Sequence, residues 1–244
     1  MKLEIVKYIL LLKYLHMRIL IVSATSFEIT PLINELIFIK NHSPNFSKYY
    51  YKGLNIDVLI TGIGMVPTAY FLGKTLVTNK YDLAFNLGIC GSFNKNLKIG
   101  ESVNINNDVF SELGIESKEE LILSEELKIS EQYYFSTPYN QITNNFISDY
   151  PLFESLKKVK GVTVNTISGN DQSIEKIKSK FKPDTESMEG AAFLHACKIE
   201  NINCLQLRAI SNYVKQRDKA DWNIPLAVKN LNSLMISYIN DVSI

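Results

Sequence analysis

Two carboxylates and several small residues precede an apolar stretch in the segment TESMEGAA, residues 185–192. From Met188 onward, apolar residues recur at helical spacing, and Ser187 or Thr185 could cap that helix. Glu189 is then expected in the first helical turn, where the helix dipole favours its ionised form by about 0.3–1 kcal/mol. No Lys or Arg stands three or four residues from it, so its expected partner is a ligand or solvent. The alternative is an ordinary acidic residue that opens a solvated helix.

A third carboxylate follows the first predicted strand of the chain. Residues 18–22 (RILIV) form the nearly continuous apolar run typical of a buried parallel strand, and a small polar turn leads from them to Glu28. This order places Glu28 at the carboxyl edge of a sheet, where α/β proteins bind ligands. The alternative is a Glu that only serves the dipole of the following helix. Helical spacing predicts that this helix runs from about residue 27 to about residue 39.

Two further predicted strands, residues 56–60 and 83–87, each run into a pair of glycines. The first pair, in the sequence GIG at 62–64, lacks the third glycine and the following acidic residue of a dinucleotide-binding motif. The second pair lies in GICGS, residues 88–92, and makes Ile89 and Gly91 candidates for ligand contact. We expect two loops here that line one cleft, although a tight turn explains either pair alone.

The remaining pattern alternates strands with helices. Strands are predicted at 101–105, at 161–166 before Ser168 and Gly169, and at 204–210 before Asn212. Helices are predicted up to residue 181, after the segment 185–192, and from about residue 222 onward, whereas 106–150 is expected to form loop and short helix. The pattern predicts a single α/β domain with a mainly parallel, mixed central sheet flanked by helices.

Composition narrows the functional classes. The 244 residues permit one large domain, and the net charge of +1 with interspersed signs gives no electrostatic footprint for nucleic acid or a membrane surface. The three cysteines are scattered without metal-ligand spacing, which suits a cytoplasmic protein and predicts no metal site. The apolar run within residues 1–16 is too short to span a bilayer. We expect 1–16 to be a dispensable extension and 17–244 to be the functional domain.

Five segments together resemble the purine nucleoside phosphorylase and nucleosidase superfamily. They are SATSFE (23–28), GIG (62–64), NLGICGS (86–92), SMEGAA (187–192) and RAISN (208–212). The resemblance extends from Met17 to the end of the chain. Within the superfamily, SNYV (211–214) and WNIPLA (222–227) are similar to futalosine hydrolases. The resemblance implies a nucleoside phosphorylase-like fold, a small-molecule nucleoside as substrate, no cofactor and a homo-oligomer.

The resemblance also implies roles for individual residues. Glu28 matches the position that activates the attacking water, a role worth roughly two to four orders of magnitude in rate. Met188 and Glu189 match the ribose site, where charge-assisted hydrogen bonds tighten at an oxocarbenium-like transition state. Asn212 matches the position that contacts the purine base. Further candidates for substrate contact are Ile89, Gly91, Ser168, Gly169 and Ser187.

Water is the expected nucleophile. A phosphorylase must hold a phosphate ion, and arginines usually help in this superfamily, but segments 23–28, 61–67 and 86–92 contain no Arg or Lys. A phosphate site built from backbone amides stays open as an alternative. The adenine-cleaving nucleosidases have Asp where this chain has Asn212. A departing 6-oxopurine presents N7–H as donor and O6 as acceptor, which an Asn amide complements.

The expected reaction is therefore the hydrolysis of futalosine to dehypoxanthine futalosine and hypoxanthine, a step of menaquinone biosynthesis. The alternatives are a 5′-methylthioadenosine/S-adenosylhomocysteine nucleosidase, a purine nucleoside phosphorylase, and a non-catalytic nucleoside-binding protein. The presence of both Glu28 and Glu189 argues against the last, because binding alone needs no water activator. Futalosine carries a carboxylate beyond its ribose 5′ position, for which Arg217 or Lys215 are candidate partners.

Overall fold

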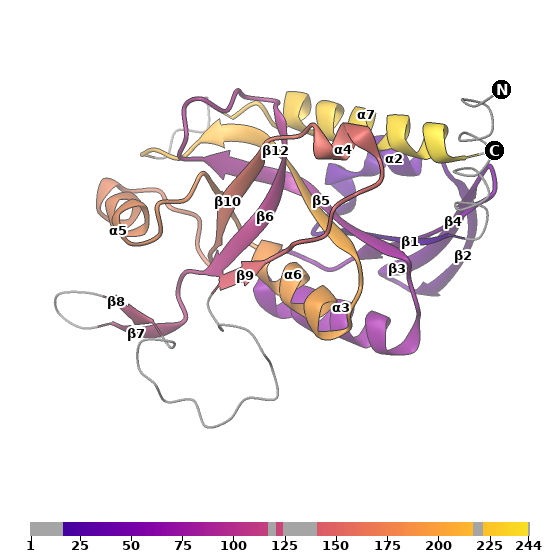
Figure 1. Ribbon diagram of the computed structural model, residues 1–244, viewed down its shortest axis with the longest axis horizontal. Coiled ribbons are helices and arrows are strands. Elements are labelled where there is room, and N and C mark those ends of the chain that lie inside the picture. Colours follow the sequence, from indigo (N-terminus) through magenta and orange to yellow (C-terminus); the bar gives the residue numbers. More distant parts are fainter. Residues whose placement is uncertain (1–16, 117–120, 124–140, 217–221, 244) are drawn as a thin grey trace.

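The apolar run at 18–22 forms strand β1 (Arg18–Ser23), which lies inside a ten-stranded mixed sheet (Figure 1). The computed structural model describes residues 17–116, 121–123, 141–216 and 222–243. The other strands of the sheet are β2 (Ile37–Ser43), β3 (Phe46–Tyr51), β4 (Leu54–Ile60), β5 (Leu83–Ser92), β6 (Ser102–Phe110), β9 (Gln141–Thr143), β10 (Lys158–Thr163), β11 (Thr185–Ser187) and β12 (Cys204–Tyr213). Strands β7 (Gly114–Glu116) and β8 (Leu121–Leu123) pair separately.

The strand order brings the carboxyl ends of three strands to one edge. The order is β11-β10-β6-β12-β5-β1-β4-β3-β2, and β9 pairs with β6. β5 pairs in parallel with both β1 and β12, so their carboxyl ends meet, whereas β12–β6, β3–β4 and β2–β3 are antiparallel. β11 pairs with β10 on one side and antiparallel with β5 on the other. These pairings close β5, β12, β6, β10 and β11 into a ring of strands.

Helices cover both faces of the sheet. They are the 3-10 helix η1 (Ser26–Glu28), α2 (Thr30–Ile33), α3 (Met65–Thr78), α4 (Pro151–Glu154), α5 (Asp171–Phe181), α6 (Gly190–Ile199) and α7 (Ile224–Val242). Because successive strand residues face opposite ways, Ile19 and Ile21 pack with α2, α4 and α7, whereas Leu20 and Val22 pack with α3 and α6. Figure 1 shows these two groups of helices above and below the sheet.

The structure confirms the α/β class, the mixed sheet, and the helices that end at Phe181 and that begin near Trp222. The predicted helix up to residue 39 is wrong, because the helix α2 ends at Ile33 and residues 37–43 form β2. The isoleucines and the phenylalanine at 37–39 favour a strand. The spacing of apolar residues within one segment does not reveal that the segment pairs with β3.

Two further expectations need correction. Residues 106–150 were expected to form loop and short helix. The segment instead begins with the second half of β6, and its described residues contain strands and no helix. The GICGS sequence at 88–92 is not a loop, because it forms the end of β5, which pairs with β11 and β12. Residues 1–16 lie outside the described residues, so the idea that they are dispensable stays a prediction.

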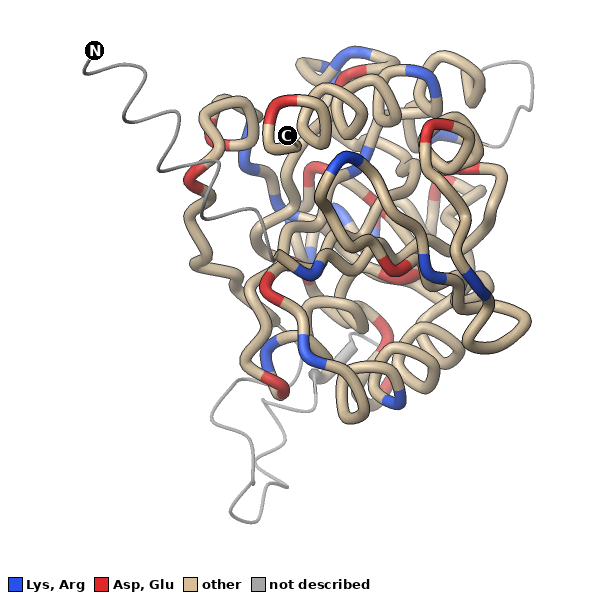
Figure 2. Tube along the Cα trace, turned by 90° about the vertical axis from the view of Figure 1, so that its right-hand side faces the viewer, with Lys and Arg blue, Asp and Glu red and all other residues tan. Residues whose placement is uncertain are grey.

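Charges of both signs are distributed over the molecule. In the view of Figure 2, lysines and arginines alternate with aspartates and glutamates, and no broad area of one sign is visible among the described residues. None of the described helices has the length and apolar character needed to cross a membrane. That this chain binds no nucleic acid stays an expectation from the charge pattern.

Candidate active site

A cavity of about 200 Å³ opens at the edge of the sheet where β1, β5 and β12 end. It brings together residues that are far apart in the sequence. Of the candidates named from the sequence, those that line the cavity are Glu28, Ile89, Gly91, Ser187, Met188, Glu189 and Asn212. Ser168 and Gly169 do not line it. The described part of its wall also includes Glu186 and the apolar side chains of Phe27, Ile63, Ile167, Trp222 and Ile224.

Glu28 is held by a capping box around the short helix η1. Its Oε2 accepts hydrogen bonds from the Thr25 N–H (3.1 Å), the Thr25 hydroxyl (2.9 Å) and the Ser23 hydroxyl (3.3 Å). Its Oε1 accepts from the Ile89 N–H on β5, at 3.1 Å. The side chain is buried, and these donors from two strand ends fix its orientation toward the cavity. These four hydrogen bonds hold the carboxylate in one orientation at the cavity wall.

Glu189 lies just before the helix and not in its first turn, where it was predicted. The helix α6 begins at Gly190, so Glu189 is its N-cap and not part of its first turn. The N-cap position is held by Glu189 and not by Ser187 or Thr185, which belong to β11, and the Ser187 hydroxyl accepts from the first helical N–H, that of Gly190. The Glu189 carboxylate is buried, which excludes the solvated-helix alternative. Its Oε1 accepts from the Gly64 N–H at 3.1 Å, in a loop that needs glycine because the φ of residue 64 is +103°.

The cation beside Glu189 is Arg208, which the sequence reasoning did not single out. Arg208 lies on β12 with 1% of its side chain exposed, and its Nη1 is 3.3 Å from Glu189 Oε2. Its Nη2 donates to Asn86 Oδ1 at 2.6 Å, and its Nη1 donates to the Ile89 carbonyl at 3.4 Å. The signal in the sequence was an arginine inside the apolar strand CLQLRAI, since a fully buried Arg needs a carboxylate partner. Arg208 therefore fixes Glu189 from behind the cavity wall.

Gly88 provides the space for this arrangement. A Cβ atom built at Gly88 would lie 2.2 Å from Arg208 Nη1 and 2.9 Å from Glu28 Oε1. Both charged groups thus crowd against the same point of β5, and only the absence of a side chain there permits it.

We expect Gly88→Ala to displace Arg208 and Glu28 and to lower turnover at least tenfold. Overpacking should also cost about 1–3 kcal/mol of stability. The matched control is Gly73→Ala, where an added Cβ meets no atom within 4 Å and a helical Ala should stabilise by up to about 1 kcal/mol. Steady-state rates and thermal melts of both variants check this expectation. Equal activity of the two variants would contradict it.

Asn212 reaches the cavity from an irregular end of β12. The register of β12 against β5 shifts between Ile210 and Asn212, and such a bulge re-aims a side chain. Asn212 Oδ1 accepts from the Ser211 hydroxyl at 2.7 Å, and its Nδ2 donates to the Tyr213 carbonyl at 3.2 Å. The amide is 6% exposed, so its remaining hydrogen-bonding capacity is directed at the cavity.

Ser168 and Ser187 act on the backbone and on other side chains around the cavity. The Ser168 N–H and hydroxyl both donate to the Glu186 carboxylate, at 3.0 and 2.5 Å. Ser187 Oγ accepts from the Gly190 N–H at 3.4 Å, at the start of α6. Ser168 was predicted from the sequence to contact substrate, but it hydrogen-bonds to Glu186, a residue of the cavity wall. Glu186 was not among the candidates named from the sequence.

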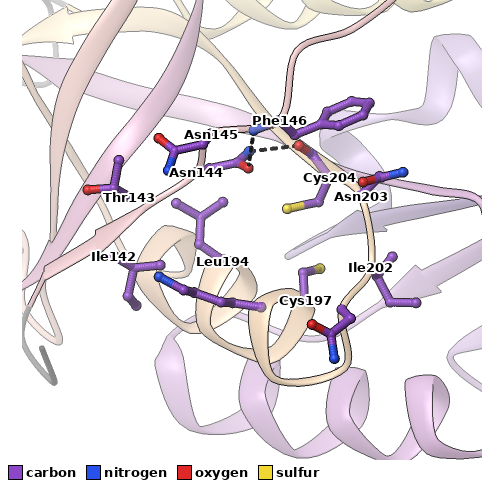
Figure 3. A pocket seen from close by; sticks show the side chains of 12 residues that line it. Ile142, Thr143, Asn144, Asn145, Phe146, Leu194, Cys197, Ile202, Asn203 and Cys204 are labelled. Carbon is purple, nitrogen blue, oxygen red and sulfur yellow. Dashed lines mark hydrogen bonds between the residues drawn. The ribbon is translucent and has the colours of Figure 1, made fainter. Parts of the chain in front are cut away.

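Another cavity, of about 340 Å³, lies at the opposite end of β12 (Figure 3). Its wall includes the thiols of Cys197 and Cys204, and Asn144 Nδ2 donates to the Cys204 carbonyl at 2.7 Å. Burial raises the pKa of the Cys197 thiol well above its ordinary value. Burial also raises the pKa of the third thiol, that of Cys90, to about 12. Within the described chain, no three His, Cys, Asp or Glu side chains gather as they would around a metal ion. The cavity that holds Glu28 and Glu189 is the candidate active site, because it brings two buried carboxylates together.

Known proteins share this fold and sequence pattern. A family model described as the phosphorylase superfamily matches residues 18–240. A futalosine hydrolase of Thermus thermophilus is 28% identical over 180 residues, which cover 74% of this chain and 79% of that protein. A 5′-methylthioadenosine/S-adenosylhomocysteine nucleosidase of Buchnera aphidicola is also 28% identical, over 91% of this chain and 89% of that protein. The structure of a futalosine hydrolase from Helicobacter pylori superposes with a TM-score of 0.76 at 18% identity, covering 92% of this chain and 98% of that one.

Proposed function

Because this chain belongs to the phosphorylase superfamily, we propose that it hydrolyses the N-glycosidic bond of a 6-oxopurine nucleoside, with futalosine as its substrate. Its relatives include futalosine hydrolases and nucleosidases, which share N-glycosidic hydrolysis. The observation that carries the proposal is one cavity that holds two buried carboxylates, Glu28 and Glu189, together with the amide of Asn212. The products would be hypoxanthine and dehypoxanthine futalosine.

In this mechanism Glu189 and Met188 hold the ribose. The carboxylate accepts hydrogen bonds from the sugar hydroxyls, and these bonds strengthen as the ring gains oxocarbenium character. Arg208 and the Gly64 N–H keep the carboxylate in place before substrate arrives, so little reorganisation is needed. Glu28 receives a proton from the attacking water, and its four hydrogen-bond donors keep it aimed at that water.

The charges of the cavity favour water over phosphate as the nucleophile. Glu28, Glu186 and Glu189 line it, and its described lining residues include no Lys or Arg. The nearest buried cation, Arg208, lies behind the wall and is already paired with Glu189. A phosphate ion would be repelled by the carboxylates that line this buried site, whereas a transition state with a cationic sugar is attracted to them.

Asn212 favours a 6-oxopurine over adenine as the leaving base. The identity values do not decide this point, because the futalosine hydrolase and the 5′-methylthioadenosine/S-adenosylhomocysteine nucleosidase are each 28% identical to the chain over the aligned residues. An amide offers an acceptor to N7–H and a donor to O6, but it cannot lend a proton to adenine N7 as a protonated Asp can. A site that leaves a buried polar group unpaired discriminates by orders of magnitude.

The test incubates the purified protein with futalosine, inosine, methylthioadenosine and S-adenosylhomocysteine, with and without phosphate. We expect hypoxanthine and a free reducing sugar from futalosine, at a rate independent of phosphate, and slow release of adenine. Asn212→Asp should lose at least tenfold in kcat/KM on futalosine and gain a trace of adenine release, because a carboxylate lacks the amide donor for O6.

The control for this substitution is Asn41→Asp, an identical change on the exposed strand β2. It should leave both rates unchanged. Rapid adenine release by the unmodified protein would support a methylthioadenosine/S-adenosylhomocysteine nucleosidase instead. Formation of a sugar phosphate would make the enzyme a phosphorylase.

Self-association is part of the proposal. Phe27 and Ile63 line the cavity, yet each is 61% exposed, and Val66 and Tyr70 on the neighbouring helix α3 are 76% and 62% exposed. A second copy packed over this apolar area would cover it and complete the rim of the cavity. Analytical ultracentrifugation of the purified chain tests this, and a monomer at micromolar concentration would contradict it.

A further inference from the structure

Asn232 is a buried polar residue on the apolar face of α7, and the mechanism above does not use it. Its neighbours Leu231 and Met235 belong to the same core cluster as Leu32 of α2. Only 1% of Asn232 is exposed. A buried amide needs hydrogen-bond partners, so the partners that it has indicate what it holds in place.

The amide of Asn232 contacts the backbone on both sides of the junction between η1 and α2. Its Nδ2 donates to the Glu28 carbonyl at 2.8 Å, and its Oδ1 accepts from the Leu32 N–H at 3.0 Å. Nδ2 also donates to the Val228 carbonyl at 2.6 Å, which fixes the amide against its own helix. A residue of α7 therefore holds the segment that carries Glu28, although 204 positions separate the two in the sequence.

These contacts replace one hydrogen bond of the helical backbone. In a continuous α-helix the Leu32 N–H would donate directly to the Glu28 carbonyl, four residues earlier. Here the Asn232 amide lies between these two groups and bonds to both. The regular pattern begins one residue later, where the Ile33 N–H donates to the Ile29 carbonyl at 2.9 Å. A side chain inserted in this way bends or interrupts a helix.

The backbone bends at the point of insertion. Ile29 has φ −127° and ψ 9°, outside the α-helical region, and it separates η1 from α2. Before the bend, η1 is a tight 3-10 turn in which the Ile29 N–H donates to the Ser26 carbonyl at 3.1 Å. From this turn the Glu28 carboxylate reaches both the Thr25 N–H and the Ile89 N–H. The direction of the carboxylate thus depends on the interrupted helix.

We propose that Asn232 is a positioning residue, which sets the direction of the Glu28 carboxylate by keeping η1 and α2 from joining into one helix. This inference rests on the proposed function, because it takes Glu28 to activate the attacking water. An amide suits the position, since it offers a donor and an acceptor at the end of one short side chain. A carboxylate lacks the donor, and an apolar side chain lacks both.

The experiment replaces Asn232 by leucine, which is similar in size, and by serine, which is too short to reach both backbone groups and leaves room for water. We expect kcat to fall by about 10- to 100-fold in each variant, because the carboxylate no longer points at the attacking water. KM should stay within about threefold, since other residues hold the ribose and the base. Steady-state kinetics well below the melting temperature measure both constants, and the serine variant decides the question if the leucine variant does not fold.

A double-mutant cycle separates positioning from a general structural role. In the Glu28→Gln background, Asn232→Ser should lower kcat by less than about threefold, because no catalytic carboxylate is left to misplace. Single-turnover rates measure this step in the slow variants. A structural role elsewhere would lower kcat by the same factor in both backgrounds, and that result would overturn the inference. So would a loss that appears in KM and leaves kcat unchanged.

The matched control is Asn240→Ser, about two turns further along α7. Asn240 is exposed, and its Nδ2 donates to the Ile236 carbonyl at 3.0 Å, four residues earlier, as that of Asn232 does to Val228. The control therefore removes the same bond within the helix without touching the segment of Glu28. It should keep both kinetic constants. An equal loss of kcat in the two serine variants would contradict the inference.

A crystal structure of Asn232→Leu gives a readout that does not need turnover. The distance from Glu28 Oε1 to the Ile89 nitrogen is 3.1 Å in the unmodified protein and should exceed about 3.5 Å in the variant. An unchanged distance would overturn the inference. If Glu28 moves but the unmodified protein hydrolyses no nucleoside, the placement of Glu28 by Asn232 stands and the proposed reaction fails. If a nucleoside is hydrolysed but both Asn232 variants keep kcat, the reaction stands and the inference fails.

Discussion

Glu189→Gln is expected to lower kcat/KM about a thousandfold, since hydrogen bonds that tighten at an oxocarbenium-like transition state contribute several kcal/mol. The neutral amide keeps the size of the side chain but removes the charge that both the ribose hydroxyls and Arg208 require. The loss should appear in kcat as well as in KM, because the bonds strengthen on the way to the transition state. Steady-state kinetics would measure this loss, with the nucleoside from which the protein releases its base fastest as the substrate.

This substitution also has a structural cost that must be measured beside the rate. Arg208 is 1% exposed, and removing the charge of its partner breaks a buried ion pair, which costs roughly 3–5 kcal/mol in proteins. Thermal melts therefore accompany the kinetics, and rates are taken well below the melting temperature. Glu200→Gln, at the other end of α6 and outside the cavity, is the matched control and should change neither property. A Glu189→Gln variant with unchanged kcat/KM would dismiss the ribose role.

Glu28→Gln is expected to lower kcat by two to four orders of magnitude while largely retaining substrate affinity. An amide cannot take the proton of the attacking water, whereas the ribose and base contacts lie with other residues. In one orientation the amide nitrogen would face the N–H and hydroxyl donors of Thr25, and in the other it would face the Ile89 N–H of β5. The free energy of unfolding should therefore fall by about 1–3 kcal/mol.

Single-turnover rates and equilibrium binding of the nucleoside separate these effects for Glu28→Gln. The matched control is Glu35→Gln, an exposed residue just beyond α2 that has no contact with the cavity. If Glu28→Gln lost binding and kept its rate once bound, Glu28 would be a substrate-binding group and another base would have to activate the water.

Local pattern was sufficient to predict where the carboxylates lie. The buried run at 18–22 ends at a sheet edge, so the position of Glu28 beside the cavity follows from the order of strand, turn and helix. The apolar spacing after Met188 likewise predicted α6, within two residues at its start. Both inferences need only neighbouring residues.

The pairings between distant segments could not be predicted in this way. Glu189 meets Arg208 because α6 and β12 pack together, and Glu186 meets Gly91 because β11 turns antiparallel to β5. Neither contact leaves a periodic signal in the sequence. For the same reason β2 was mistaken for helix, since its strand conformation depends on the partner β3.

The position of β12 within the sheet has a consequence for synthesis of the chain. Of the described strands β12 is the last to be made, yet it lies between β5 and β6 in the interior of the sheet. A ribosome adds roughly 5–20 residues per second, so β5 and β6 emerge well before the strand that joins them, and each then presents an unpaired edge. A nascent chain released before residue 204 would lack Arg208 and Asn212 and would keep both edges open. Such a fragment is expected to aggregate with other copies of itself and not to form a smaller active enzyme.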